Sequence, residues 1–207
     1  MSNPDFSQLP LCGDLDMRIA RDGTWFYRGS PISRKPLVKL FSSVLRREDD
    51  GAYWLVTPAE RGRVVVEDAP FTAIEVTASG TGHNQVLRLR INVDEEVVVD
   101  AGHPIWVTVD PVSNAPAPYL RVRPAMPPMM RQSAPLARPA DATPPFGLEA
   151  LILRSVYYHL IEFGAYHVVD GKTAFGVWSS GSFFPLGELD ADESEAEIST
   201  RKGGETG

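Results

Sequence analysis

The residue types in this chain that best suit chemistry are aromatic and arginine side chains, which are able to hold an anionic ligand. An aromatic face accepts the stacking of any base, and a guanidinium group binds phosphate through paired hydrogen bonds. The candidates are the aromatic residues Trp25, Tyr27 and Phe71 and the arginines Arg34, Arg63 and Arg121. The alternative places the aromatics in the core and the arginines on solvated faces, because aromatics dominate core burial and arginines mostly stay in water.

Two further segments have polar groups that suit an anion. Thr57-Pro58-Ala59-Glu60 matches a capping box with proline at the first helical position, and a helix N-terminus presents free N–H groups. The alternative for this segment is purely structural, a single turn that ends a strand before Gly62. Asp68 lies between two predicted strands, where it either binds a ligand or accepts hydrogen bonds from the local backbone.

No arrangement of nucleophile, base or metal ligands stands out in the sequence. Cys12 has no neighbour in the sequence that would make it a reactive thiolate. None of the histidines has the close pairing with an acid by which zinc enzymes bind metal on a helix. These histidines are His83, His103, His159 and His167. We therefore expect no catalytic residue, metal or cofactor, with an enzyme that uses the carboxylates of Glu60 and Asp68 as the alternative.

The composition is that of an ordinary globular protein. The chain has 207 residues and a formal net charge of −7, with its arginines dispersed among acids, so we expect no binding to nucleic acid. No apolar run approaches the roughly 20 residues that cross a bilayer, and the first residues lack the features of a secretory signal. We therefore expect a cytoplasmic protein that does not bind membranes.

Local patterns predict a hairpin, a helix and a strand in the first part of the chain. Residues 15–19 and 25–27 alternate between apolar and polar side chains on either side of Asp22-Gly23, which suits a tight turn. Apolar residues recur at helical spacing over residues 34–47, with Pro36 in the first turn, where a missing N–H costs little. Residues 53–56 are aromatic and β-branched, as in a buried strand.

The middle of the chain predicts an antiparallel sheet. Gly80-Thr81-Gly82 is followed by no lysine and no helical pattern, so it indicates a hairpin turn and not a phosphate loop. None of the connections is long enough for a helical crossover, which favours antiparallel pairing. The predicted strands cover residues 64–67, 71–77, 86–92, 97–100, 105–109 and 119–122.

The last third of the chain predicts an insert, a helix, a hairpin and a tail. Residues 124–147 are rich in proline and lack periodicity, as in a flexible linker. An apolar stripe at helical spacing predicts a helix over residues 148–163. Strands over residues 175–178 and 183–186 then form a hairpin. Residues 188–207 are acidic without apolar periodicity, and we expect this tail to be disordered.

Together these elements indicate an α+β protein with two lobes. We divide the chain into an extension over residues 1–11, an N-terminal α+β lobe over residues 12–68 and a C-terminal lobe over residues 69–187. The C-terminal lobe would be an antiparallel sheet closed by the helix over residues 148–163. Trp25 and Trp178 each lie near a Gly-Ser step and a proline. This echo indicates either a duplicated hairpin/helix core or a chance likeness between two hairpins.

Several short motifs occur together in the order typical of one bacterial family. The motifs are Cys12-Gly13, Asp22-Gly23-Thr24-Trp25, Gly29-Ser30-Pro31-Ile32, Leu55-Val56-Thr57-Pro58-Ala59-Glu60, Glu67-Asp68-Ala69-Pro70-Phe71, Pro118-Tyr119-Leu120-Arg121-Val122-Arg123 and Leu148-Glu149-Ala150-Leu151. On these motifs the chain resembles the uncharacterised family called domain of unknown function 1285. The departure from the family pattern is the stretch 124–146, an insert that would either cover the ligand site or extend into solvent.

The resemblance implies a two-lobed α+β fold with a duplicated core and a C-terminal lobe loosely similar to the pleckstrin-homology type. It also implies a crevice between the lobes for a nucleotide-like ligand and a role in signalling, and it supplies no catalytic residues.

We therefore expect a non-catalytic regulatory protein in which a small anionic ligand favours one arrangement of the lobes, which an unknown protein partner then reads. The alternatives are the enzyme noted above and an interaction module that uses the proline-rich insert or the acidic tail.

Overall fold

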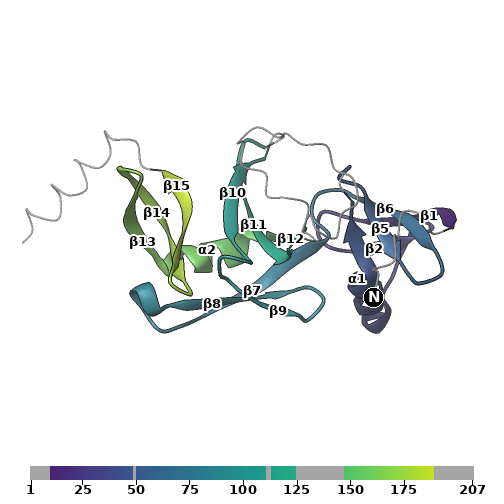
Figure 1. Ribbon diagram of the computed structural model, residues 1–207, viewed down its shortest axis with the longest axis horizontal. Coiled ribbons are helices and arrows are strands. Elements are labelled where there is room, and N and C mark those ends of the chain that lie inside the picture. Colours follow the sequence, from purple (N-terminus) through teal and green to yellow (C-terminus); the bar gives the residue numbers. More distant parts are fainter. Residues whose placement is uncertain (1–9, 49, 111–112, 125–146, 189–207) are drawn as a thin grey trace, which may run out of the picture.

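The computed structural model describes residues 10–48, 50–110, 113–124 and 147–188 (Figure 1). The predictions for residues 1–9, for most of the predicted insert (125–146) and for the tail from residue 189 lie outside these residues. Within the described part the chain is a mixed α+β protein, mostly strands arranged in three curled sheets, with two α-helices. Neither of these helices is long and apolar enough to cross a membrane.

The first sheet is built from the N-terminal part of the chain. Its strand order is β3-β2-β1-β6-β5-β4, and its neighbours are antiparallel except for the parallel pair β1 and β6. The predicted hairpin is confirmed, because Met17, Arg18 and Ile19 lie opposite Tyr27, Phe26 and Trp25. The bounds are β1 Leu11–Ile19, β2 Trp25–Tyr27, β3 Ser30–Pro31, β4 Leu45–Arg47, β5 Tyr53–Val56 and β6 Arg61–Val66.

Helix α1 (Lys35–Val44) lies beside this sheet (Figure 1). Pro36 occupies its first turn, as the sequence predicts. The prediction that the helix continues to residue 47 is wrong, because Leu45 is completely buried and begins strand β4 opposite Leu55. Burial of one leucine and pairing with β5 thus end the helix after Val44.

The second sheet has the order β10-β11-β12-β7-β8-β9. The sequence predicted antiparallel pairing throughout, and this is wrong at one place, where β12 runs parallel to β7. The bounds are β7 Phe71–Ser79, β8 Val86–Ile91, β9 Glu96–Val98, β10 Ile105–Val109, β11 Pro116–Arg123 and β12 Leu148–Ile152. Gly80-Thr81-Gly82 lies in the connection between β7 and β8, as expected for a hairpin turn.

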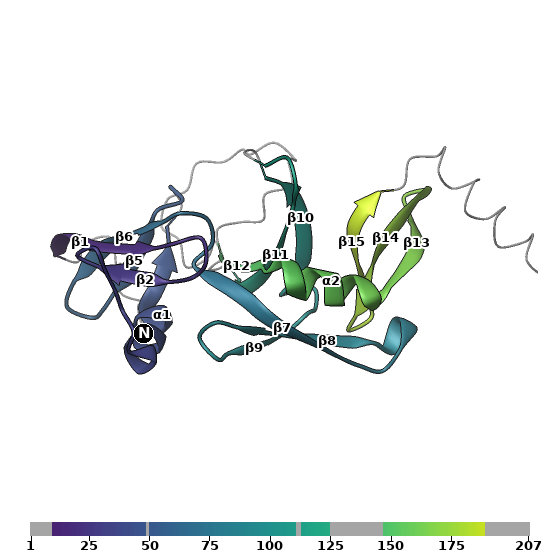
Figure 2. The same ribbon diagram turned by 180° about the vertical axis from the view of Figure 1, so that it is seen from behind.

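The predicted helix over residues 148–163 is wrong in its first part. Residues Leu148–Ile152 form strand β12, between β11 and β7, and helix α2 (Arg154–Glu162) follows. A strand buried on both faces is apolar at nearly every position, so it also satisfies a helical spacing. Helix α2 buries Val156 and Leu160 and lies beside β7 and β14 (Figure 2).

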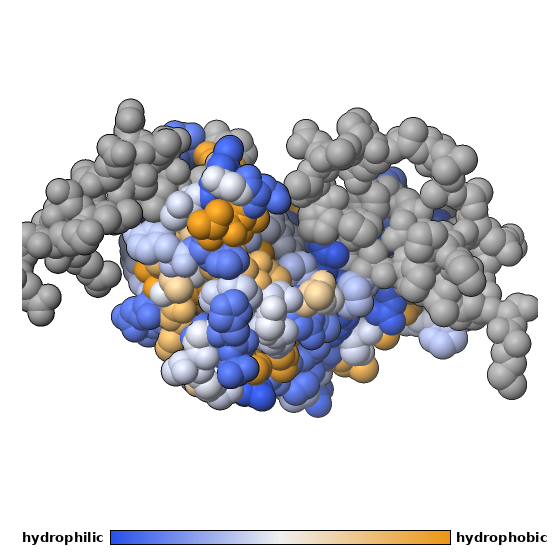
Figure 3. Space-filling model, turned by 60° about the vertical axis from the view of Figure 1, so that its left-hand side comes forward, coloured by the Kyte–Doolittle hydropathy of each residue, from blue (hydrophilic) through white to orange (hydrophobic). Residues whose placement is uncertain are grey.

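The third sheet contains β13 (Gly164–Val169), β14 (Lys172–Ser179) and β15 (Ser182–Glu188) in that order. The hairpin of β14 and β15 is as predicted, whereas β13 was not predicted. Figure 3 shows this end of the molecule, where hydrophobic side chains form separate patches in a largely hydrophilic surface. Exposed hydrophobic residues of β13 include Tyr166 and Val168.

A buried hydroxyl group joins the second and third sheets. Ser179 is completely buried. Its Oγ accepts a hydrogen bond from the Leu87 N–H (2.9 Å) and donates one to the Val99 carbonyl (2.6 Å). The Gln85 side chain adds a hydrogen bond from Nε2 to the Trp178 carbonyl (2.8 Å). These hydrogen bonds satisfy the Leu87 N–H and the Ser179 hydroxyl and help to fix the position of the third sheet.

The sequence echo around Trp25 and Trp178 corresponds to two hairpin turns. Arg28-Gly29 has φ values of 50° and 77°, and Ser180-Gly181 has values of 51° and 76°. Two consecutive positive φ values suit a two-residue hairpin turn, and Gly adopts them without steric cost. Asp170-Gly171 has the same conformation, with 51° and 80°. The echo therefore coincides with hairpin turns of the same conformation.

Candidate functional site: a crevice between helix α1 and the β8–β9 turn

A crevice of about 400 Å³ lies where the first sheet and α1 meet the second sheet. One wall comes from residues around β2 and α1, and the other comes from the turn between β8 and β9. The lining residues are Gly23, Thr24, Trp25, Ile32, Ser33, Lys35, Pro36, Val38, Lys39, Asn92, Val93 and Asp94. A volume in the range of ordinary small-molecule sites, lined from two sheets, makes this the candidate site.

Helix α1 places two cations on the crevice. Lys35 and Lys39 are four residues apart on α1, so they lie on one face of the helix, and both are exposed. Among the described residues, neither lysine forms an ion pair. On the opposite wall, Asp94 has a weak contact with Arg90 at 3.6 Å. The α1 side of the crevice therefore has an uncompensated positive charge.

The N-terminus of α1 strengthens this positive character. Its N-cap residue, Arg34, makes no side-chain capping hydrogen bond, and no acidic residue lies in its first turn. A helix N-terminus has the positive end of the helix dipole, which an anion would complement. Ser33, just before the helix, adds an exposed hydroxyl group to the crevice lining.

Trp25 belongs to the crevice wall and to the core. Its side chain is 1% exposed, and its ring stacks on Phe41 with the ring centroids 6.2 Å apart and the planes at 22°. The ring therefore has no free face for a base. Its indole Nε1 is buried and has no hydrogen-bond partner within the described residues.

Asn92 joins the two walls at the edge of the crevice. Its Nδ2 donates to the Gly23 carbonyl (3.1 Å), and its Oδ1 accepts from the Thr72 N–H (3.2 Å). Gly23 has φ +83°, and a Cβ atom there would lie 2.5 Å from Nδ2 of Asn92. Only glycine therefore allows this close approach of β1–β2 to the second sheet.

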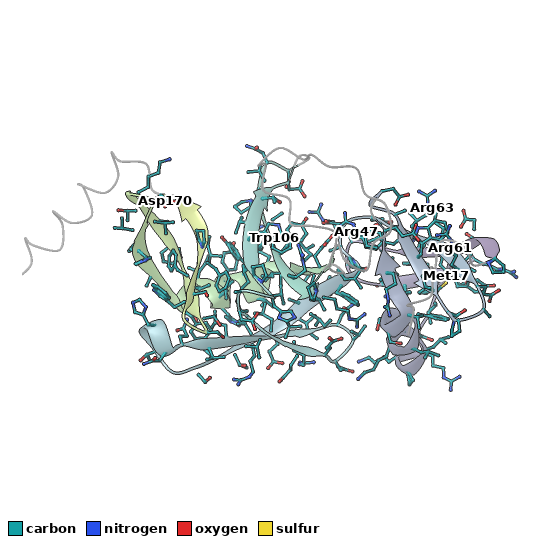
Figure 4. The ribbon with its side chains drawn as sticks, in the orientation of Figure 1. Met17, Arg47, Arg61, Arg63, Trp106 and Asp170 are labelled. Carbon is teal, nitrogen blue, oxygen red and sulfur yellow. The ribbon has the colours of Figure 1, made fainter. Side chains whose placement is uncertain are left out.

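A buried carboxylate connects the same two sheets. Glu149 of β12 accepts a hydrogen bond from Arg47 Nη1 (2.6 Å) and another from the Tyr53 hydroxyl (2.9 Å). Burial raises the pKa of Glu149, although the nearby Arg47 and Arg121 and the two hydrogen bonds act in the opposite direction. Figure 4 shows Arg47 between the first sheet and Trp106 of the second.

Asp68 takes part in a second connection between the sheets. It accepts a hydrogen bond from the Tyr119 hydroxyl (2.7 Å) and forms an ion pair with Arg21 Nε (3.1 Å). Arg21 also pairs with Asp110, which lies after β10. Burial is the main cause that raises the pKa of Tyr119, and the hydrogen bond to Asp68 raises this pKa further. Both carboxylate oxygens of Asp68 thus take part in structural contacts, Oδ1 with Tyr119 and Oδ2 with Arg21.

Two other residues predicted from the sequence also lie at this junction and not in the crevice. Phe71 is completely buried, with the Arg123 guanidinium 5.5 Å from its ring centroid. Arg121 is 5% exposed, and its guanidinium lies 5.4 Å from the ring centroid of Trp106. Desolvation lowers the pKa of Arg121. The burial of Phe71 matches the alternative that places the aromatic residues in the core. Arg121 does not match its alternative, a solvated face, because it is buried in β11.

The Thr57–Glu60 segment is a hairpin turn between β5 and β6. The Thr57 N–H donates to the Glu60 carbonyl (3.0 Å), and the Glu60 N–H donates to Thr57 Oγ1 (3.2 Å). The predicted helical turn is wrong because β5 and β6 pair directly on both sides of these residues. Without a helix, the argument for an anion at this segment no longer applies.

The predicted residues are therefore spread over several places. Thr57, Glu60 and the half-exposed Tyr27 line a second cavity, which lies between α1 and the first sheet. Arg63 is exposed on β6, opposite Trp54 and far from Trp106 in Figure 4. Of the nine ligand residues predicted from the sequence, only Trp25 lines the crevice. Arg34 is the residue that precedes α1, next to the lining residues Ser33 and Lys35.

The crevice residues missed from the sequence are mainly Lys35, Lys39 and Asn92. The lysine pair was visible as an i, i+4 repeat on a predicted helix, yet such pairs usually lie on solvated faces. No pattern in the sequence indicates Asn92, because its role depends on a contact with Gly23, which lies far away in the sequence. In the part of the chain that the structure describes, no group of three or more His, Cys, Asp or Glu side chains could hold a metal ion.

Comparison with known proteins gives two family matches and similar solved structures. "Domain of unknown function (DUF1285), N-terminal domain" matches residues 7–69, and "Protein of unknown function (DUF1285), C-terminal domain" matches residues 70–134 and 145–186. A DUF1285 family protein from Silicibacter pomeroyi DSS-3 is 42% identical, with a TM-score of 0.72, over 93% of this chain and 90% of that chain.

A second solved structure, a DUF1285 family protein from Shewanella baltica OS155, is 25% identical with a TM-score of 0.47, over 70% of this chain and 90% of that chain. No protein with a curated description matches. Because the two family matches together extend over most of its length, this chain belongs to the DUF1285 family.

Proposed function

We propose that this protein is a non-catalytic regulatory protein that binds a small anionic, nucleotide-like ligand in the crevice between α1 and the β8–β9 turn. The observation that carries the proposal is the pair Lys35 and Lys39, which have no ion-pair partner among the described residues and line a crevice formed by two sheets. The positive end of α1 adds to the same local potential. A phosphate or carboxylate group would neutralise this charge.

The mechanism follows from the position of the crevice between two lobes. We take the N-terminal lobe as the first sheet with α1 and the C-terminal lobe as the second and third sheets with α2, which agrees with the boundary between the two family matches. A ligand that contacts Lys35 or Lys39 on one lobe and Asn92 on the other stabilises only the arrangement that brings both walls together. The population of that arrangement then rises with ligand concentration, and a protein partner reads the change.

We also propose that the C-terminal lobe follows a plan similar to the pleckstrin-homology type, with α2 covering one end of its strands. Val156 and Leu160 of α2 are buried, and the helix lies beside both β7 and β14. Helix α1 and the β8–β9 turn, which line the crevice, lie on the side of the second sheet that faces away from the third sheet (Figure 1).

Isothermal titration of the full chain with mononucleotides, dinucleotides, inorganic phosphate and small carboxylates tests the proposal. The double variant Lys35→Gln and Lys39→Gln removes the crevice charges. The matched control, Arg63→Gln with Arg88→Gln, removes two exposed cations outside the crevice. We expect saturable binding of at least one anion, weakened at least tenfold in the lysine variant and less than twofold in the control. Equal weakening in both variants, or no binding across the panel, would overturn the proposal.

A further inference from the structure

Helix α1 has an apolar face that is only half buried. Leu37, Phe41 and Val44 recur at helical spacing on this face, yet all three keep partial exposure, and Ser42 is the residue of α1 that is buried. An amphipathic helix on a packed core normally buries its apolar stripe. The space between α1 and the first sheet is therefore incompletely filled by the protein's own side chains.

That space is a cavity of about 400 Å³ within the N-terminal part of the chain. Leu37, Phe41 and Val44 of α1 form one wall, and Leu15, Met17 and Leu55 of the first sheet form the other. Cavities of this size that are lined almost entirely by apolar side chains are typical of sites for apolar ligands. The cavity shares only Ile32 with the crevice described above, so it is a separate site.

A glycine shapes the sheet wall of this cavity. Gly62 of β6 is buried, and a Cβ atom at this position would overlap the side chain of Leu15 from the neighbouring strand. The missing side chain at Gly62 thus leaves the space that the Leu15 side chain occupies in this apolar wall.

The rim of the cavity is polar on one side. Thr57 and Glu60 line it there, and the Thr57 hydroxyl is already bonded to the Glu60 main chain. The Glu60 side chain is exposed and forms no ion pair within the described residues. A carboxylate at the mouth attracts a cationic head group and repels an anionic one.

We infer that this cavity binds a small amphiphile, with its hydrocarbon tail beneath α1 and a cationic or uncharged head group beside Glu60. Burial of the tail removes both the ligand and the half-exposed side chains of α1 from water, which provides the driving force. Glu60 sets the order of preference among head groups: ammonium first, hydroxyl second and carboxylate last. The inference does not depend on the anion site, because the two sites use different residues of α1 and share only Ile32.

The test uses the full chain and the uncharged fluorescent probe N-phenyl-1-naphthylamine, displaced by dodecylammonium, dodecanol and dodecanoate below their aggregation concentrations. We expect saturable probe binding and displacement in the order ammonium, alcohol, carboxylate. In Glu60→Gln the advantage of ammonium over carboxylate falls at least threefold, while dodecanol is unchanged. Absence of saturable probe binding, or tightest binding of dodecanoate, would overturn the inference.

Filling the cavity supplies the second arm of the test. Leu37→Trp places a larger side chain in the cavity, and Leu40→Trp puts the same substitution on the same helix at a residue that is 60% exposed and outside the lining. We expect at least tenfold weaker probe binding in Leu37→Trp and a change of less than twofold in Leu40→Trp. Leu15→Trp fills the cavity from the opposite wall and replaces Leu37→Trp if circular dichroism shows that the latter is unfolded. Unchanged binding in a folded filling variant would refute the site.

Discussion

Arg47 and Glu149 form an ion pair between the first and second sheets, with Nη1 2.6 Å from Oε1, although they lie 102 residues apart in the sequence. The Tyr53 hydroxyl donates to the same carboxylate oxygen, and the Arg47 guanidinium lies 5.0 Å from the Tyr53 ring centroid. These three side chains are part of the contact that holds the two sheets together.

Removal of Arg47 tests the importance of this pair. We expect Arg47→Ala to lower the free energy of unfolding by about 3 kcal/mol, because the buried carboxylate of Glu149 loses its hydrogen-bonded cation. Arg90→Ala is the control, since Arg90 pairs with Glu75 while both side chains are well exposed, and such pairs contribute about 0–1 kcal/mol. Urea denaturation followed by tryptophan fluorescence measures both values. Equal losses in the two variants would contradict the assignment of a buried pair.

The raised pKa of Glu149 predicts how this site responds to pH. A carboxyl group whose pKa is higher in the folded than in the unfolded state stabilises the fold below the unfolded value, near 4.3, and this contribution is lost as the pH rises through the folded value. The free energy of unfolding of the wild type should therefore fall relative to that of Glu149→Gln as the pH rises from the unfolded pKa of Glu149 through its higher folded pKa. Denaturation midpoints of both proteins between pH 4 and pH 8 measure the difference. The opposite slope would show that Arg47 and Tyr53 outweigh burial.

Gly23 is predicted to be intolerant of a side chain. Gly23→Ala should destabilise the protein by about 2 kcal/mol or more, from a positive φ together with displacement of the Asn92 hydrogen bonds. Gly29→Ala is the matched control, because Gly29 has φ +77° but no atom within 4 Å of the added methyl group. The free energy of unfolding of Gly29→Ala should fall by only about 1 kcal/mol, which is the cost of a positive φ at a residue with a side chain. Thermal unfolding of both variants separates the two contributions, and equal losses would argue against a close approach at Gly23.

Ser179 is predicted to be a strong determinant of how the third sheet attaches to the second. Ser179→Ala leaves the buried Leu87 N–H without an acceptor, which should lower the free energy of unfolding by about 2–3 kcal/mol. Ser43→Ala removes an exposed hydroxyl bonded to the Leu40 carbonyl and should change stability by less than about 0.5 kcal/mol. Amide hydrogen exchange at Leu87 gives a local readout, which should accelerate in Ser179→Ala alone.

The sequence predicted those elements whose information is local. The β1–β2 hairpin followed from its alternation and from Asp22-Gly23, and α1 followed from Pro36 and a helical apolar repeat. The end of α1 was not predictable in this way, because Leu45 leaves the helix to be buried opposite Leu55. The apolar sequence of strand β12 predicts a helix for a related reason, because this strand is buried between β11 and β7 and is apolar at nearly every position.

The candidate site was much less predictable than the fold. Trp25 was predicted as a ligand residue, yet its stacking on Phe41 depends on the packing of α1. Arg121 has the right chemistry for phosphate but lies at a buried position in β11. Asn92 and Lys35 face one crevice only because two sheets meet there. Contacts between distant segments leave no periodicity in the sequence, and so pattern analysis could not find them.

The parallel pairing of β12 with β7 has a consequence for how the protein is made. All strands of the first sheet end by residue 66, whereas β7 obtains its β12 neighbour only when Ala150 reaches Phe71. On the ribosome, the first sheet and α1 have their full sequence early, while strand β7 must wait with an open edge for a much later segment. Closing so long a loop slows folding and leaves that edge exposed to other chains in the meantime. Translation that pauses between β11 and β12 would therefore favour aggregation of nascent chains more than a pause after β15.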